Sequence, residues 1–216
     1  MTGNPAATVF IGLAAATALL DWWAVASRRR HVEYVAKPAV MVWLVAAAML
    51  IDPGAASATR ALFVAALILS LAGDVFLMLE PERFIAGLAS FLLAHIAYSV
   101  GLFLVPSFQG VALAVGFVVV ALALALVGRR IAAAVRSDEP ALLAPVLAYI
   151  AVISTMVAFA IATRNALAIA GAGLFYLSDA LLAWARFVAP IRGGPLLVIV
   201  SYHLGQGLLI LSLTTM

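Results

Sequence analysis

The stretch Leu71-Ala72-Gly73-Asp74-Val75-Phe76-Leu77-Met78-Leu79 places a carboxylate inside a long apolar run that begins near Ala61. A second stretch, Leu174-Phe175-Tyr176-Leu177-Ser178-Asp179-Ala180-Leu181-Leu182, has the same arrangement later in the chain. An ionised side chain at the centre of a membrane helix costs at least ~2.5–3.5 kcal/mol, so such a residue usually has a function. The two stretches therefore predict a membrane helix bundle with a functional site at its acids.

The composition supports lipid rather than water as the solvent. The chain has 216 residues, of which 67% are hydrophobic and 10% are charged, whereas soluble domains are about 45–50% apolar and about 25% charged. Its apolar runs are roughly 16–22 residues long, which suits membrane helices and is too long for the strands of a membrane barrel. The absence of cysteine excludes disulfides and thiolate metal sites.

We predict an all-α integral membrane protein with eight transmembrane helices in a single domain, residues 1–216. We expect the first apolar run to be a retained helix rather than a signal peptide, because basic residues follow it instead of preceding it. The predicted spans cover residues 6–26, 38–51, 61–79, 85–105, 111–127, 142–162, 166–187 and 195–213.

The distribution of Lys and Arg between alternate loops predicts the orientation. Only Arg60 and Arg164 fall on one side. The residues on the other side are Arg28, Arg29, Arg30, Lys37, Arg83, Arg129, Arg130, Arg136, Arg186 and Arg192. Because cytoplasmic loops carry the excess of basic residues, we expect both termini to lie outside, on the periplasmic face of a multi-pass protein of the cell (inner) membrane. The basic residues thus report topology, and no nucleic-acid partner is expected.

The spans place Asp74 and Asp179 at a similar depth, in the cytoplasmic half of the membrane. Each acid precedes, by a similar interval, a polar residue on the following span: His95 in one case and Tyr202 in the other. This spacing suggests two four-helix halves with the same orientation, a 4+4 parallel repeat, with a site between them.

Further polar side chains lie within the predicted spans and are candidates to line the same cavity. They are Lys37, His95, Tyr98, Tyr149, Tyr176, Tyr202 and Gln206. Each also has a simpler interpretation, since a membrane histidine or tyrosine can serve only to bond neighbouring helices and a lysine can mark the interface rather than bind a lipid phosphate. His203, next to Tyr202, points about 100° away from it on a helix, so we expect Tyr202 and Gln206 to share the inward face.

Two other classes of active site find little support. A metal site needs three or four ligands, and the histidines show no HxxxH or HExxH spacing. A serine hydrolase of the α/β type needs a GxSxG motif, which does not occur. We therefore expect no metal and no cofactor, and the two acids remain the main candidates for a functional site.

Seen together, these residues resemble the YhhN-like family, the lysoplasmalogenases of bacteria and animals. The resemblance runs in order from the second span to the eighth. Its pieces are Lys37-Pro38, Gly73-Asp74-Val75-Phe76-Leu77-Met78, Phe84 with Gly87-Leu88, Ser90-Phe91 with His95 and Tyr98, Gly171-Ala172 with Phe175, Ser178-Asp179, and Tyr202 with Gln206. His203 departs from the bulky or aromatic residue expected after Tyr202, and its role stays open.

The resemblance implies cleavage of the vinyl ether bond of a lysoplasmalogen, which releases a fatty aldehyde and a glycerophospho-base. Two carboxyl groups suit this reaction, as they suit glycosidases: one protonates the alkene carbon, and the other stabilises the cation and activates water. Asp74 and Asp179 are the expected catalytic pair, without an assignment of which does which. The alternatives are a related membrane lipid hydrolase and a transporter or binding protein that uses the same cavity.

Overall fold

The structure, a computed structural model, describes residues 4–51, 57–81 and 83–216. Those residues form helices and no strands, and eight of the helical segments are long and apolar enough to cross a membrane, which makes the chain a multi-pass membrane protein. The helices are α1 Pro5–Ala26, α2 Arg30–Leu50, α3 Ser57–Met78, α4 Phe84–Phe103, α5 Gly110–Ala123, α6 Arg129–Asp138, α7 Leu143–Thr163, α8 Ala166–Phe187 and α9 Gly194–Ser212. Two short segments complete them, the π-helical η1 Leu124–Gly128 and the 3₁₀ turn η2 Pro140–Leu142.

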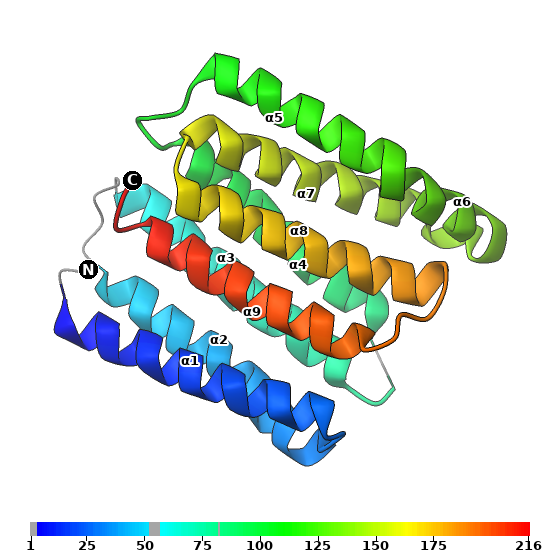
Figure 1. Cartoon of the computed structure of the whole chain (residues 1–216), viewed down its shortest axis with the longest axis horizontal. Helices are drawn as coiled ribbons and strands as arrows, with labels where there is room; N and C mark the ends of the chain where they lie inside the picture. The colour runs from blue at the N-terminus through cyan, green and yellow to red at the C-terminus, as the bar shows by residue number, and fades with distance from the viewer. Residues whose placement is uncertain (1–3, 52–56, 82) are drawn as a thin grey trace.

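Contacts between neighbouring helices close a ring of seven. In order around it, α1, α2, α3, α4, α7, α8 and α9 each pack on the next, and α9 returns to α1. Helix α5 lies outside the ring against α7, at the edge of the bundle opposite α1 and α2 (Figure 1). Helix α1 begins and α9 ends at the same end of the bundle (Figure 1).

Small residues let helices of the ring approach closely. A Cβ atom added to Gly171 of α8 would lie 2.8 Å from the Leu209 backbone nitrogen of α9, and one added to Gly205 would lie 2.9 Å from the Gly171 carbonyl oxygen. On the other side of the ring, a Cβ at Gly73 of α3 would lie 2.6 Å from the Phe91 ring of α4. Such close approach is the usual basis of helix association in lipid, and here it fixes the two helices that carry the acids against their neighbours.

Helix α2 begins at Arg30, eight residues before the predicted start of the span at Pro38. Proline often opens a helix, but here Pro38 lies inside α2. The first turns are joined to the end of α3, where the Tyr34 hydroxyl donates to the Met78 carbonyl oxygen (2.9 Å) and Arg30 forms an ion pair with Glu80 (2.7 Å). Because these turns are polar, hydropathy did not reveal them.

The predicted loop after the fifth span is also helical. Gly128, Arg129 and Arg130 continue from α5 through η1 into α6, so one rod runs from Gly110 to Asp138. Helix α6 is held by its apolar side, where Ile131 and Val135 pack with Val146 of α7. The basic residues Arg129, Arg130 and Arg136 are exposed, so the helix continues through them.

Candidate active site

Asp74 binds one cation and one hydroxyl group. Its Oδ1 lies 3.0 Å from the Lys37 ammonium nitrogen of α2, and its Oδ2 accepts a hydrogen bond from the Tyr202 hydroxyl of α9 at 2.7 Å. The side chain of Asp74 is 2% exposed and that of Lys37 is 16% exposed. Charge-assisted bonds of this kind are stronger than neutral ones, so the surroundings of Asp74 favour a fixed carboxylate.

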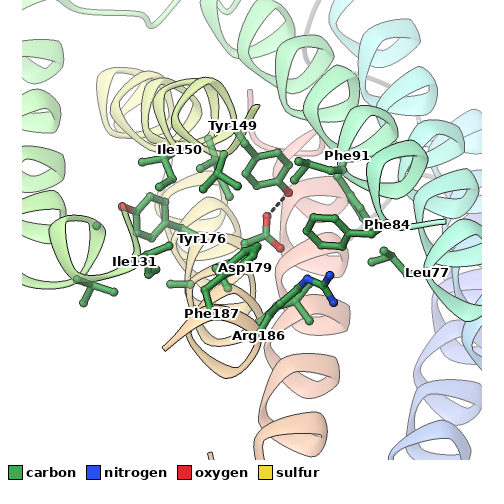
Figure 2. A pocket seen from close by; sticks show the side chains of 18 residues that line it. Leu77, Phe84, Phe91, Ile131, Tyr149, Ile150, Tyr176, Asp179, Arg186 and Phe187 are labelled. Atoms are coloured by element: carbon green, nitrogen blue, oxygen red, sulfur yellow. Dashed lines mark hydrogen bonds between the residues drawn. The ribbon is translucent and has the colours of Figure 1, made fainter. Parts of the chain in front are cut away.

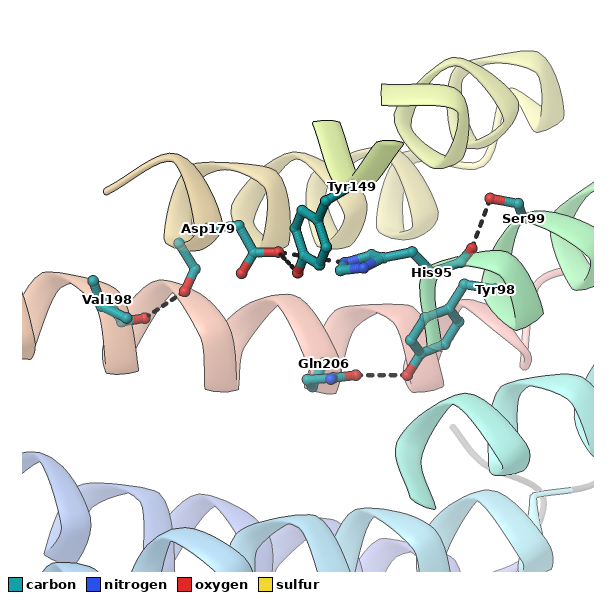
Figure 3. Close-up of polar contacts among 8 residues, drawn as sticks. His95, Tyr98, Ser99, Tyr149, Asp179, Val198 and Gln206 are labelled. Atoms are coloured by element: carbon teal, nitrogen blue, oxygen red, sulfur yellow. Dashed lines mark hydrogen bonds and ion pairs between the residues drawn. The ribbon is translucent and has the colours of Figure 1, made fainter. Parts of the chain in front are cut away.

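Asp179 has different partners. Its Oδ2 accepts a hydrogen bond of 2.5 Å from the Tyr149 hydroxyl of α7, and His95 Nε2 of α4 lies 3.5 Å from the same oxygen (Figure 3). Among the residues that the structure describes, no Lys or Arg forms an ion pair with Asp179. The second carboxyl group is therefore surrounded by groups that can be neutral.

Both carboxyl groups line one cavity, with an empty volume of about 1,120 Å³ that includes its open mouth. Lys37 and Tyr202 line it with them, and Arg30, Glu33 and Tyr34 lie at the α2 end, beside the α1–α2 connection. We call this space the polar cavity. It is large enough for a phosphate-bearing head group, and it offers cations at the end where the loops carry most of the basic residues.

A second cavity, the apolar cavity, adjoins the first and has an empty volume of about 810 Å³, open mouth included. Asp179 lines both cavities, together with Leu77, Phe91 and Leu182. Figure 2 shows Asp179 and Tyr149 in the wall of the apolar cavity. The carboxyl group of Asp179 thus lies where a polar compartment meets an apolar one.

The remaining predicted site residues lie in three different settings. Tyr176 lines the apolar cavity, and Figure 2 shows its hydroxyl turned away from Asp179. Tyr98 and Gln206 are buried, but they bind each other at 2.5 Å (Figure 3) and line neither cavity. His95 contacts Asp179 without lining either cavity. The geometry therefore places Tyr98 and Gln206 apart from the carboxyl groups.

The sequence interpretation did not identify a third buried carboxyl group, that of Asp21. Asp21 of α1 is 0% exposed, and neither of its oxygens has a hydrogen-bond partner among the described residues. It lies on the same face of α1 as the buried Ala14 and Ala18, a pattern of small residues that could have indicated an inward-facing side. Every helix of the ring thus contributes a polar side chain to the interior.

His203 faces α1 rather than either carboxyl group. Its Nδ1 accepts a hydrogen bond of 3.2 Å from the Trp22 indole nitrogen, and the two rings stack with centroids 6.5 Å apart. His203 is 4% exposed, so it is as inward as Tyr202 but lies on the α1 side of the helix. As for a metal centre, the described part of the chain brings together no group of three His, Cys, Asp or Glu residues that could hold an ion.

Comparisons with known proteins match the sequence of the chain to one family. Residues 32–213 match the model of the YhhN family, a range that contains both carboxyl groups and all of their partners. Lysoplasmalogenase TMEM86B of Homo sapiens is 31% identical over 147 residues, which are 68% of this chain and 61% of the human protein. The protein of the same name from Sus scrofa is 34% identical over 149 residues, 69% of this chain and 62% of that protein.

The matched region thus spans less than two thirds of the length of these relatives. No solved structure matches the chain. Helix α1, with Asp21, lies wholly before the matched residues, whereas the other six helices of the ring fall almost wholly within them. From the match over that ring and from these two relatives, we conclude that the chain belongs to the YhhN family.

Proposed function

We propose that this protein is a membrane hydrolase that cleaves the vinyl ether bond of lysoplasmalogens to a fatty aldehyde and a glycerophospho-base. The observation that carries the proposal is the position of Asp179, which lines both the polar and the apolar cavity. In a lysoplasmalogen, the vinyl ether joins the polar glycerol to the hydrocarbon chain. A lipid with its head group in one cavity and its chain in the other has this bond at Asp179.

We assign the first step to Asp179 because no Lys or Arg of the described residues forms an ion pair with it. The carboxyl proton of Asp179 passes to the alkene carbon that is not bonded to oxygen. This leaves an oxocarbenium ion at the other alkene carbon, which we call the ether carbon. The Tyr149 hydroxyl bonds the Oδ2 of Asp179 and orients the group. General acid catalysis of this kind contributes typically ~10²–10⁴-fold to the rate.

We assign the second step to Asp74, which Lys37 and Tyr202 hold as a carboxylate. Its negative charge stabilises the cation, and it accepts a proton from the water that adds to the ether carbon. The resulting hemiacetal then collapses. Its hydroxyl group loses a proton, the bond to the glycerol oxygen breaks, and this oxygen gains a proton, which gives the aldehyde and the free glycerol hydroxyl. One water is consumed, and the proton left on Asp74 replaces the one that Asp179 gave.

The basic end of the bundle is proposed to face the cytoplasm, with both chain termini outside, in the cell membrane. This follows from the excess of Lys and Arg at that end. It places the mouth of the polar cavity, with Arg30 and Lys37, on the cytoplasmic side. The lipid phosphate would bind there.

Release of aldehyde from lysoplasmenylethanolamine by the purified protein in detergent tests the proposal. We expect activity in the wild type, with and without EDTA, and its loss in Asp74→Asn and Asp179→Asn. Asp138→Asn is the matched control, because Asp138 is an exposed carboxylate at the end of α6. A folded wild type that releases no aldehyde across head groups and chain lengths would contradict the proposal and favour transport or binding.

A further inference from the structure

The apolar cavity lies on the far side of Asp179 from the polar cavity. Figure 2 shows Leu77 on one side of Asp179, and Ile131, Ile150 and Tyr176 on the other. Leu77 also lines the polar cavity, whereas the other three do not. The apolar cavity therefore runs from the shared wall at Asp179 toward α6 and α7.

The lining of the apolar cavity suits hydrocarbon and does not suit water. Of its eighteen lining residues, only Asp179 and Arg186 have a carboxyl or guanidinium side chain, and Arg186 lies over the Phe84 ring at 4.2 Å. A buried water needs about two to four polar partners, which the walls near Ile131, Ile150 and Val146 do not offer.

A π-helical segment forms part of the wall. Residues Leu124–Gly128 are π-helical, and Val127 and Gly128 of this segment line the cavity. Single π turns inside α-helices are rare and occur frequently at functional sites. Here the segment connects α5 to α6, whose Ile131 closes the far side of the cavity.

The two cavities together have the form of a single-chain amphiphile. One contains Arg30, Lys37 and the carboxyl groups, and the other is almost wholly apolar. Their shared wall consists of Leu77, Phe91, Asp179 and Leu182. A lipid with one hydrocarbon chain fits this pair of cavities.

We propose that the apolar cavity binds the hydrocarbon chain of a lysophospholipid, and that Ile150 of α7 and Ile131 of α6 limit the length of chain that it accepts. The proposal rests on the proposed function for the identity of the lipid. It adds a binding site and the residues that determine its specificity.

Binding of chains that cannot be cleaved tests this directly. The probes are saturated 1-O-alkyl lysophosphoethanolamines with chains from ten to eighteen carbons, competed against a labelled sixteen-carbon analogue. In Ile150→Trp we expect affinity for the longest chains to fall about 10-fold or more, because the larger side chain overpacks the space that these chains fill. Affinity for the shortest chains should stay near that of the wild type. Retained binding of short chains also shows that the variant is folded.

Two further variants complete the design. Ile150→Ala enlarges the cavity, and we expect it to shift the preference toward longer chains. Val115→Trp is the matched control, because Val115 is an exposed residue of α5 that does not line the cavity. An equal loss at every chain length in Ile150→Trp, or the same change in Val115→Trp, would overturn the proposal.

A chain with a diazirine at its last carbon locates the site independently. Photolysis should label peptides of α6 or α7, and labelling confined to α1 and α2 would overturn the proposal. Failure of the proposed function would look different. If the protein releases no aldehyde but still shows the chain-length shift, the chain site exists and the proposed reaction is wrong. If it releases aldehyde and shows no shift, the hydrocarbon chain binds elsewhere.

Discussion

Asp74 and Asp179 line the same cavity but bind different partners. Asp74 binds a lysine cation and a tyrosine hydroxyl, whereas Asp179 binds a tyrosine hydroxyl and lies beside a histidine. Only Asp179 also reaches the apolar cavity. From this difference we propose different roles for two identical side chains: Lys37 holds Asp74 as a carboxylate, whereas Asp179 carries the proton.

The contacts also cross between the halves of the chain. Asp74 of α3 meets Tyr202 of α9, and Asp179 of α8 meets His95 of α4. A 4+4 repeat would place equivalent residues in this way. The acid of each half would be contacted by the helix that follows the acid-bearing helix of the other half. The repeat itself stays a prediction, and the lysine present on only one side marks where the two halves differ.

Removal of the proposed acid should have the largest effect on catalysis. Asp179→Asn keeps the size of the side chain but cannot give up a proton, so we expect the kcat for aldehyde release to fall about 10²–10⁴-fold. Asp179→Glu should recover only part of this loss, because it restores a carboxyl group but places it farther from the backbone. Full activity in Asp179→Asn would contradict the role of Asp179 as the acid.

Removal of the cation should affect the fold most. Lys37→Met leaves the Asp74 carboxylate buried without its partner, a change that costs up to ~3–5 kcal/mol in fully buried pairs and less here, because Lys37 is 16% exposed. The double variant Lys37→Met/Asp74→Asn removes both charges and should regain stability. Thermal unfolding in detergent measures this cycle, and a double variant no more stable than the single one would refute the pairing.

The two tyrosines provide a finer comparison. A hydrogen bond to a charged group contributes about 1.5–3 kcal/mol and a neutral one about 0.5–1.5 kcal/mol. If Asp74 is ionised and Asp179 is protonated, Tyr202→Phe should lower the unfolding midpoint more than Tyr149→Phe. In an Asp74→Asn background the effect of Tyr202→Phe should shrink, whereas an unchanged effect would show that the charge of Asp74 does not strengthen this bond.

Tyr98→Phe should have the smallest effect. The Tyr98 hydroxyl bonds Gln206 and meets neither carboxyl group, so its loss removes one neutral hydrogen bond of about 0.5–1.5 kcal/mol. We expect kcat/KM for aldehyde release to stay close to that of the wild type. A large fall in kcat with unchanged stability would place Tyr98 in the catalytic machinery.

Hydropathy and charge predicted the eight apolar spans, because lipid requires long apolar runs and loops carry the basic residues. They did not predict that α2 begins at Arg30 or that α5 continues into α6. Both extensions are stabilised by tertiary contacts, Tyr34 with Met78 and Ile131 with Val146, and such contacts leave no local pattern in the sequence.

The candidate site was predictable in part. Carboxyl groups inside apolar runs are conspicuous because they are costly in lipid, so Asp74 and Asp179 could be selected from the sequence alone. Their partners depend on how the ring of helices closes, which single-sequence patterns do not specify. The same holds for the apolar cavity, whose walls come from apolar residues that look like any others on a membrane helix.

The transfer of deuterium tests the division of roles most directly. In D₂O, the proposed acid delivers deuterium to the alkene carbon that is not bonded to oxygen. An intermediate that water does not capture can rotate about the bond to this carbon and give up the original hydrogen to the carboxylate, so that it returns to the vinyl ether with deuterium in place. We predict that substrate recovered from Asp74→Asn, in which water addition is impaired, carries deuterium at that carbon, and that substrate recovered from Asp179→Asn carries none. Deuterium in the substrate from Asp179→Asn, or in neither case, would contradict the assignment.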